Sequence, residues 1–256
     1  MKQVDVDGRA IAYDDAGEGL SVLLIHGNFA SRRWWREQLD AVPAGLRFIA
    51  PDLPNFGDSG ALGGPITLDA YARAVLGLAD ALDLERPALV GHSLGAAVVH
   101  RLAALAPERW HALVLVSPPP PASFPTPEAH FPVLESFRGR PDLLGPALAA
   151  MMPARVPPTF DDLVADGLRM QPEAFSGNAR ALEEGLPEGA VARYAGPVLV
   201  LRGGLDALIT ETLARAAADA YPNGRLETWP DVGHSPQIEA PERFTQLLAE
   251  SLGEPP

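Results

Sequence analysis

Short apolar segments, separated by stretches with helical spacing, most restrict how this 256-residue chain can fold. A strand with one solvent-exposed face alternates apolar and polar residues, whereas an unbroken apolar strand is typical of a parallel sheet covered on both faces. Strands that alternate with helices predict a sheet of that kind. The strands expected here are SVLLI (21–25), RFIAPD (47–52), PALVG (87–91), ALVLVS (112–117), PVLVLRG (197–203) and RLETWP (225–230).

The helices expected between these strands follow from apolar residues at helical spacing. An antiparallel pair of strands, QVDVDG and RAIAYDD, precedes them and turns at Asp7-Gly8, which is a common hairpin dipeptide. Thr67 is the expected N-cap of the first long helix, because its hydroxyl can accept a hydrogen bond from a free backbone N–H. The helical segments are 34–42, 67–84, 94–106, 209–222 and 241–252.

The alternation stops after residue 117 and resumes near residue 191. The stretch between holds about half of the chain's 27 prolines and no strong strand signal, so short helices separated by prolines are expected. We therefore predict a core domain formed by residues 1–117 and 191–256, and a helical cap formed by residues 118–190. Ligands bind at the carboxyl ends of strands in open parallel sheets. The cap leaves the end of such a strand and is expected to cover that site.

A Gly-x-Ser-x-Gly motif follows one of the buried strands, as GHSLG at residues 91–95. A sharp turn from strand to helix strains the residue at its apex and crowds the positions two residues to either side. Gly91 and Gly95 have no Cβ to clash there, and the turn exposes the Ser93 hydroxyl at the start of a helix. Chance produces this motif in about one chain in ten of this length, so the strand and helix around it carry the argument.

A serine hydroxyl needs a base to become nucleophilic, and His234 is the best placed of six histidines. His234 lies in DVGHSP, after the strand 225–230, and therefore at the sheet edge where Ser93 emerges. Asp206 follows the strand 197–203 and can fix the tautomer of the imidazole. Asp231 is the weaker alternative for that carboxylate, since it is expected to shape the loop. We expect packing or surface roles for the other histidines, although His130, in the cap, could contact substrate.

Acyl transfer also needs hydrogen-bond donors for the oxyanion. The backbone N–H of Leu94, directly after the nucleophile, is one expected donor. The loop HGNFAS (26–31) should provide the second, from the N–H of either Asn28 or Phe29.

These motifs together resemble the alpha/beta-hydrolase superfamily over essentially the whole chain. The resemblance rests on HGN (26–28), DLPNFGDSG (52–60), GHSLG (91–95), GGLD (203–206) and GHSP (233–236), which occur in the family's order. It implies an α/β fold with an eight-stranded, mostly parallel sheet flanked by helices and a helical cap inserted after strand six. It also implies Ser93 as nucleophile, Asp206 as acid, His234 as base, and the Asn28 and Leu94 amides as oxyanion hole.

Two departures from the family pattern have consequences. Asn55 stands where relatives commonly have glycine after proline, and asparagine can also take the left-handed backbone that this turn needs. The nucleophile is serine, whereas aspartate marks the haloalkane dehalogenases and epoxide hydrolases among relatives. Those two chemistries are therefore disfavoured.

The function predicted from these residues is hydrolysis of a carboxylic ester or a related acyl compound, such as a lactone or a thioester, through an acyl-enzyme. Cleavage of a C–C bond in a vinylogous diketone is the main alternative, and an acyltransferase is a lesser one. A small-molecule receptor on the same fold is the alternative of another class. A receptor would more often have lost one member of the triad.

Five apolar residues are predicted to bind substrate, with packing inside the cap as the equally weighted alternative. They are Phe29, Phe124, Phe131, Met151 and Met152. A set of cap arginines could instead recognise a carboxylate, although solvated side chains are the commoner case. These are Arg138, Arg140, Arg155, Arg169 and Arg180.

Composition limits the partners and the cofactors. A formal net charge of −13 argues against nucleic acid and anionic membranes, since both need basic patches. The chain has no cysteine, which excludes disulfides and thiolate ligands, and the proposed chemistry needs no metal or cofactor. We expect a small-molecule substrate as the partner and a cytoplasmic location, because the N-terminus lacks the apolar stretch of a signal peptide. The sequence leaves the oligomeric state open.

Overall fold

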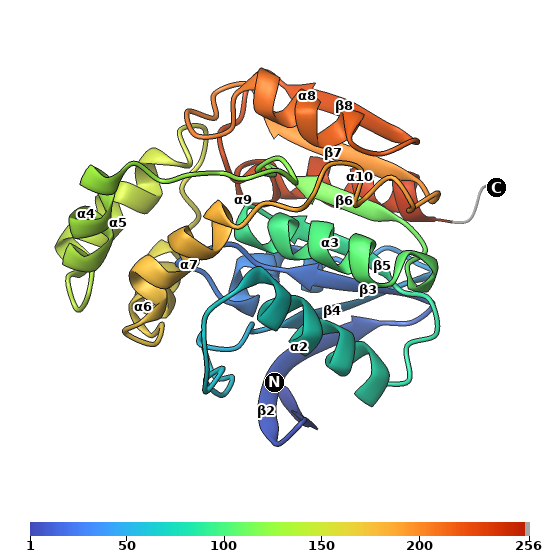
Figure 1. Cartoon of the computed structure of the whole chain (residues 1–256), viewed down its shortest axis with the longest axis horizontal. Coiled ribbons are helices and arrows are strands. Elements are labelled where there is room, and N and C mark those ends of the chain that lie inside the picture. The colour runs from blue at the N-terminus through green and yellow to red at the C-terminus, as the bar shows by residue number, and fades with distance from the viewer. Residues whose placement is uncertain (254–256) are drawn as a thin grey trace.

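The computed structural model describes residues 1–253, whose centre is one eight-stranded sheet (Figure 1). The strand order is β1-β2-β4-β3-β5-β6-β7-β8, and all neighbouring pairs from β4 to β8 are parallel. The strands are β1 (Lys2–Val6), β2 (Arg9–Gly17), β3 (Leu20–Ile25), β4 (Leu46–Pro51), β5 (Ala88–His92), β6 (Leu113–Val116), β7 (Val198–Gly203) and β8 (Gly224–Trp229). The predicted eight-stranded, mostly parallel sheet is confirmed.

The two N-terminal strands form the antiparallel edge of the sheet. β1 pairs with β2 across the predicted turn, where Asp7 and Gly8 both have positive φ angles. β2 then pairs antiparallel with β4, with Tyr13 opposite Pro51. The pairing therefore changes from antiparallel to parallel at the third strand of the sheet, β4.

The central strands are buried on both faces, as their unbroken apolar sequences require. Val22 and Leu24 of β3 belong to one apolar cluster, whereas Leu23 and Ile25 belong to the other. Successive side chains of a strand point to opposite faces, so each strand contributes to both clusters. This arrangement makes the sheet the middle layer of three.

Helices supply the two outer layers (Figure 1). On one face α2, α3 and α8 cover the strands, and on the other α1 and α10 do so. Thr67 caps α2 as predicted, because its Oγ1 accepts a 3.1 Å hydrogen bond from the Ala70 N–H. The helices of these layers are α1 (Arg36–Leu39), α2 (Leu68–Ala81), α3 (Leu94–Leu105), α8 (Glu211–Asp219), α9 (Pro236–Glu239) and α10 (Pro241–Leu252).

Two helical segments differ from their prediction. The segment 34–42 is a short 3-10 helix, η1 (Arg32–Trp35), followed by the single turn of α1. The four-residue helix α9 was not predicted at all. Both elements are too short to show a helical period of apolar residues, which is the signal that the longer helices carry.

The segment between β6 and β7 is helical and proline-rich, as expected, and residues 118–190 are called the cap segment below. Figure 1 shows its α-helices gathered on one side of the sheet. Its two ends are joined by hydrogen bonds from Phe124 N–H to the Leu182 carbonyl (2.9 Å) and from Leu186 N–H to the Pro121 carbonyl (2.8 Å). The helices are η3 (Glu128–His130), α4 (Phe131–Ser136), α5 (Pro141–Ala150), α6 (Phe160–Leu168) and α7 (Ala174–Glu183).

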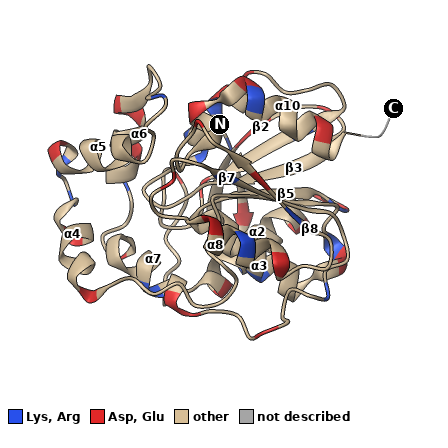
Figure 2. Ribbon diagram, turned by 90° about the horizontal axis from the view of Figure 1, so that it is seen from above, with Lys and Arg blue, Asp and Glu red and all other residues tan. Residues whose placement is uncertain are grey.

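Charged residues lie mainly on the outer helices and loops, as Figure 2 shows. The chain carries 33 acidic and 20 basic residues, so this surface is acidic overall. Among the helices formed by residues 1–253, none is both long and apolar enough to cross a membrane.

Candidate active site

Ser93 lies at the tight turn between β5 and α3, with φ of 52° and ψ of −113°. The helix packs so closely on the sheet that a Cβ on Gly91 would lie 2.5 Å from the Gly95 carbonyl oxygen. A Cβ on Gly95 would overlap the Ile25 carbonyl oxygen of β3. Glycine is therefore needed at both positions for the steric reason inferred from the motif.

Asp206 and His234 lie in the loops after β7 and β8 and contact each other. His234 Nδ1 is 2.8 Å from Asp206 Oδ2. Asp206 Oδ1 accepts hydrogen bonds from the backbone N–H groups of Leu208 (2.8 Å) and Ile209 (2.9 Å). Because a carboxylate only accepts, Nδ1 carries a proton, and Nε2 of a neutral His234 is left as the basic nitrogen.

Two opposing effects act on the pKa of Asp206. Its burial raises that pKa, but the hydrogen bond with His234 and the backbone N–H groups of Ile209 and Leu208 outweigh burial and lower it below the usual value. The carboxylate form is thus kept beside the imidazole. Asp231, the alternative acid, is exposed and pairs with Arg243 at 3.0 Å instead.

Glu239 holds the loop that carries His234. Its buried carboxylate accepts hydrogen bonds from the N–H groups of Gly233 (2.9 Å) and Ser235 (3.1 Å), the residues on either side of the histidine. It also accepts one from Ala154 of the cap segment (3.0 Å). One carboxylate therefore fixes both flanks of His234 and ties them to the cap segment.

His92 and Met151 hold the backbone of His234 itself. His92 Nε2 is 2.9 Å from the His234 carbonyl oxygen and donates to it, and the His234 N–H donates to the Met151 carbonyl at 2.9 Å. Burial lowers the pKa of His92 to about 3, so this ring stays neutral and cannot take the role of base near neutral pH. The structural role expected for His92 corresponds to this hydrogen bond with the His234 carbonyl.

The loop after β3 carries the two candidates for the second oxyanion donor. The Phe29 N–H donates to Asn28 Oδ1 at 3.1 Å, so it is already occupied. Within residues 1–253 the backbone N–H groups of Asn28 and Leu94 have no acceptor. Asn28 is therefore the better candidate of the two.

His26 fixes the start of this loop. Its Nδ1 lies 2.8 Å from the Gly27 carbonyl and donates to it, and its Nε2 accepts the Leu53 N–H at 3.0 Å. Burial lowers the pKa of His26, which keeps this buried ring neutral. Asn55, in the neighbouring loop, has a φ of 70°, which is the left-handed backbone that its sequence position calls for.

Ser93 and His234 line one cavity of about 390 Å³ between the sheet edge and the cap segment. The two side chains are not hydrogen bonded in this structure, although both face this cavity. Catalytic hydrogen bonds are often long until substrate binds. The other lining residues are Asn28, Phe29, Trp34, His92, Leu94, Phe124, Pro125, Thr126, Pro127, His130, Leu134, Phe137, Leu144, Ala147, Leu148, Met151, Ala179, Leu182, Leu208 and Ser235.

Only some of the five predicted substrate-binding residues line the cavity. Phe29, Phe124 and Met151 line the cavity, but Phe131 and Met152 do not. Met152 is 1% exposed and lies in the apolar core, and Phe131 is buried beneath the guanidinium of Arg180, 4.0 Å from its ring centroid. The prediction is therefore wrong for these two residues, because Met152 packs in the core and Phe131 packs against Arg180.

The five arginines considered for carboxylate recognition are all paired with acidic side chains, and none of them lines the cavity. Among the described residues, no Asp, Glu, Lys or Arg belongs to the lining. The pairs are Arg138 with Glu135, Arg140 with Asp142, Arg155 with Glu37, Arg169 with Asp58, and Arg180 with Glu128.

Sequence reasoning missed Glu239, Asn178 and Trp34. Glu239 acts through the backbone N–H groups beside His234, and Asn178 acts through the amide of Asn28, which is 150 residues away. Trp34 stacks on His92 with ring centroids 5.8 Å apart. The acidic residue five positions after His234, at the end of a short helix, was the one local signal that could have indicated Glu239.

Comparisons with known proteins bear on the family of this chain. Residues 22–247 match the model of the alpha/beta hydrolase family. A dihydrolipoyllysine-residue acetyltransferase component of the acetoin cleaving system from Pseudomonas putida is 31% identical over 96% of this chain and 68% of that protein. A 2-hydroxymuconate semialdehyde hydrolase from Pseudomonas sp. (strain CF600) is 28% identical over 94% of this chain and 89% of that protein.

Solved structures show the same fold. An esterase from Thermogutta terrifontis superposes with a TM-score of 0.83 and 26% identity, covering 98% of this chain and 97% of that one. An enol-lactonase from Burkholderia xenovorans LB400 has a TM-score of 0.88 and 24% identity, covering 99% and 100%.

Proposed function

Because the chain belongs to the alpha/beta hydrolase family, we propose that it is a serine hydrolase that cleaves a carboxylic ester through an acyl-enzyme. The observation that carries the proposal is the 2.8 Å contact between His234 Nδ1 and Asp206 Oδ2, together with the cavity that His234 and Ser93 both line. Residues 118–190 act in this proposal as the cap that closes that cavity. Lactones and thioesters are open to the same chemistry.

The reaction proceeds in two halves. His234 Nε2 takes the proton of Ser93 while Oγ attacks the ester carbonyl, and the oxyanion is stabilised by the N–H groups of Asn28 and Leu94. Collapse of this intermediate breaks the C–O bond, and His234 gives its proton to the departing alcohol. Water, deprotonated by the same histidine, then hydrolyses the acyl-enzyme and restores Ser93. Asp206 stabilises the imidazolium in both halves.

The lining of the cavity favours a neutral ester over the substrates of the C–C bond hydrolases. Two relatives are named as hydrolases of 2-hydroxymuconate semialdehyde and of 2-hydroxy-6-oxo-6-phenylhexa-2,4-dienoate. Both of these compounds are carboxylates. A carboxylate buried without a partner cation loses its hydration with nothing to replace it. Since the described lining holds no arginine or lysine, it supports the ester reading.

Purified protein should release p-nitrophenol from p-nitrophenyl butyrate, and Ser93→Ala should lower the rate by at least about 10³-fold, because the attacking oxygen is lost. Release is followed by absorbance, and the unfolding midpoint of both proteins shows that the variant is folded. Equal rates for the two proteins would remove Ser93 from the mechanism and favour a binding protein. Faster release on addition of an alcohol acceptor, with a new ester as product, would instead indicate an acyltransferase.

A further inference from the structure

The side-chain amide of Asn28 is held on one side and unsatisfied on the other. Its Oδ1 accepts two hydrogen bonds, from the Phe29 N–H (3.1 Å) and from Asn178 Nδ2 (2.8 Å). Its Nδ2, which has two protons to donate, has no acceptor in the described part of the chain. Asn28 also lines the cavity that contains Ser93.

The orientation of this amide is fixed by a backbone group. A flip of Asn28 would place Nδ2 against the Phe29 N–H, and two donors would face each other. Because a backbone N–H cannot exchange its role, Oδ1 must face Phe29. The amide of Asn178 must then present its own Nδ2 to Asn28. Neither carboxamide is free to reverse.

Asn178 belongs to helix α7 of the cap segment and is completely buried. Its Oδ1 accepts a 2.7 Å hydrogen bond from the hydroxyl of Tyr71, a fully buried residue of α2. Burial and the two hydrogen bonds hold the Asn178 amide in one position between Tyr71 of the core and Asn28 in the loop after β3. The cap segment therefore adds a second hydrogen bond, from Asn178, to the one by which the Phe29 N–H orients the Asn28 amide.

We propose that Asn28 Nδ2 donates a further hydrogen bond to the substrate oxygen that becomes the oxyanion, and that Asn178 is the positioning residue that aims it. This inference rests on the proposed serine-hydrolase function. Asn28 would then donate twice, through its backbone N–H and through its side chain. Because Asn178 belongs to the cap segment, docking of the cap and stabilisation of the oxyanion are coupled.

Two substitutions of Asn28 separate the donor from the fold of the loop. Asn28→Asp keeps an oxygen for Phe29 N–H and Asn178 Nδ2 but lacks the donating Nδ2. Asn28→Leu removes the amide without adding charge. We expect each to lower kcat for p-nitrophenyl butyrate by about 10-fold or more, because a preorganised donor acts mainly in the transition state. The KM should change by less than about threefold.

Asn178→Leu tests the positioning role, with Glu37→Gln as its control. Asn178→Leu should lower kcat by a similar factor without a matching change in KM. In the double variant Asn28→Leu/Asn178→Leu, kcat should be no lower than in Asn28→Leu alone, since Asn178 acts through Asn28. Glu37→Gln breaks the ion pair with Arg155 between core and cap segment, away from Asn28, and should leave kcat within about twofold.

Titration of Ser93 with diethyl p-nitrophenyl phosphate counts the active protein in each sample, so that partial misfolding is not read as a lower kcat. If wild-type protein is active and both Asn28 variants keep the wild-type kcat, the further inference is wrong while the proposed function stands. Additive losses in the double variant would likewise refute the positioning role of Asn178. Absence of turnover in wild-type protein would refute the proposed function itself.

Discussion

Ser93 has a backbone conformation that residues with a side chain rarely adopt. Its φ is 52°, and such conformations cost about 1–3 kcal/mol for a residue other than glycine. The surrounding structure maintains it through the Ser93 N–H, which donates to the Val116 carbonyl at 2.9 Å, and through the Ser93 carbonyl, which accepts from Ala96. The strain is the consequence of turning the hydroxyl away from the sheet into the cavity.

Ser93→Gly should relieve this strain and Ser93→Ala should keep it. We expect the free energy of unfolding of the glycine variant to exceed that of the alanine variant by about 1 kcal/mol. Ala104→Gly, within the same helix, should show the ordinary opposite sign and lower stability by about 1 kcal/mol. Urea unfolding of the three variants measures the difference. An alanine variant more stable than the glycine variant would show that the backbone at 93 is not strained.

Among individual residues, the sequence indicates those whose role depends on the residues next to them in the chain. Gly91 and Gly95 follow from the sterics of one turn, and Asp206 and His234 follow from their places at the ends of adjacent strands. Asn178 depends on Asn28, which is 150 residues away, and no local pattern marks such a pair. The orientations of Phe131 and Met152 depend in the same way on packing, because apolar side chains fit a cavity wall or a core equally well.

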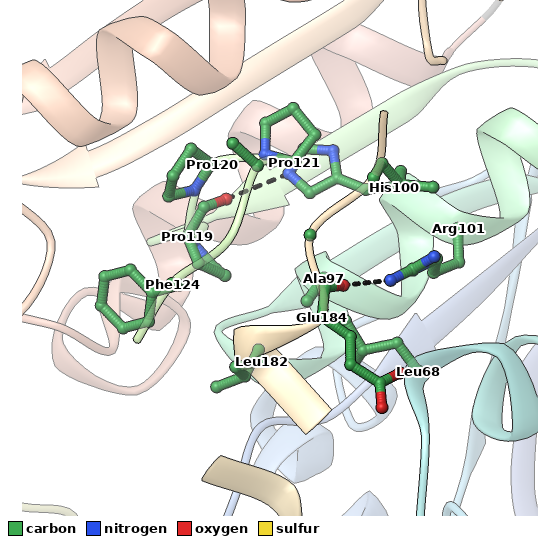
Figure 3. A pocket seen from close by; sticks show the side chains of 13 residues that line it. Leu68, Ala97, His100, Arg101, Pro119, Pro120, Pro121, Phe124, Leu182 and Glu184 are labelled. Carbon is green, nitrogen blue, oxygen red and sulfur yellow. Dashed lines mark hydrogen bonds between the residues drawn. The ribbon is translucent and has the colours of Figure 1, made fainter. Parts of the chain in front are cut away.

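Helix α3 begins at the Ser93 turn and contacts both ends of the cap segment. Figure 3 shows the contacts of His100 with Pro119 and of Arg101 with Glu184. The His100 Nε2 donates to the Pro119 carbonyl at 3.1 Å, and Arg101 donates to the Glu184 carbonyl. His100 Nδ1 accepts the hydroxyl proton of Tyr221 at 2.7 Å, so the ring is neutral. These contacts leave a pocket of only about 10 Å³ between α3 and the cap ends, too small for a substrate.

Buried His100 should make the protein sensitive to acid. Burial lowers its pKa to about 4 from a usual 6.5, so below pH 6.5 the unfolded chain binds the proton more readily, and stability falls until about pH 4. The free energy of unfolding should drop by about 2 kcal/mol more between pH 7.5 and 5 in wild-type protein than in His100→Gln, whose amide can keep both bonds. Urea unfolding at the two pH values tests this. Equal drops would show that His100 is not held neutral.

The sequence predicts the elements whose apolar residues follow a clear pattern, and it does not predict the short elements that lack one. The strands β3, β5, β6 and β7 are buried on both faces and show it as unbroken apolar runs. The helices of the cap segment have several prolines and small apolar faces, so the sequence predicts short helices there but neither their boundaries nor their packing. Their arrangement depends on contacts with the core, such as Met151 with His234 and Asn178 with Asn28.

The whole molecule combines an acidic surface with a cavity whose lining, among the described residues, contains no Asp, Glu, Lys or Arg. The net charge of −13 repels anions in solution, and this repulsion is screened by salt over a distance of about 10 Å at 0.1 M. Inside the cavity the obstacle to an anion is the loss of hydration without a compensating cation, which salt does not screen. The two effects can therefore be told apart by ionic strength.

Two esters of adipic acid, p-nitrophenyl methyl adipate and p-nitrophenyl hydrogen adipate, differ mainly in a distant negative charge. We expect kcat/KM for the neutral ester to be higher by at least about 100-fold at low salt, since both effects oppose the anion. In 1 M NaCl the difference should shrink but remain above about 10-fold, because burial of the carboxylate still lacks a partner. A ratio near one at 1 M NaCl would place the discrimination on the surface alone, and the cavity would then have to admit the anion in a hydrated form or beside a cation drawn from elsewhere in the cap segment.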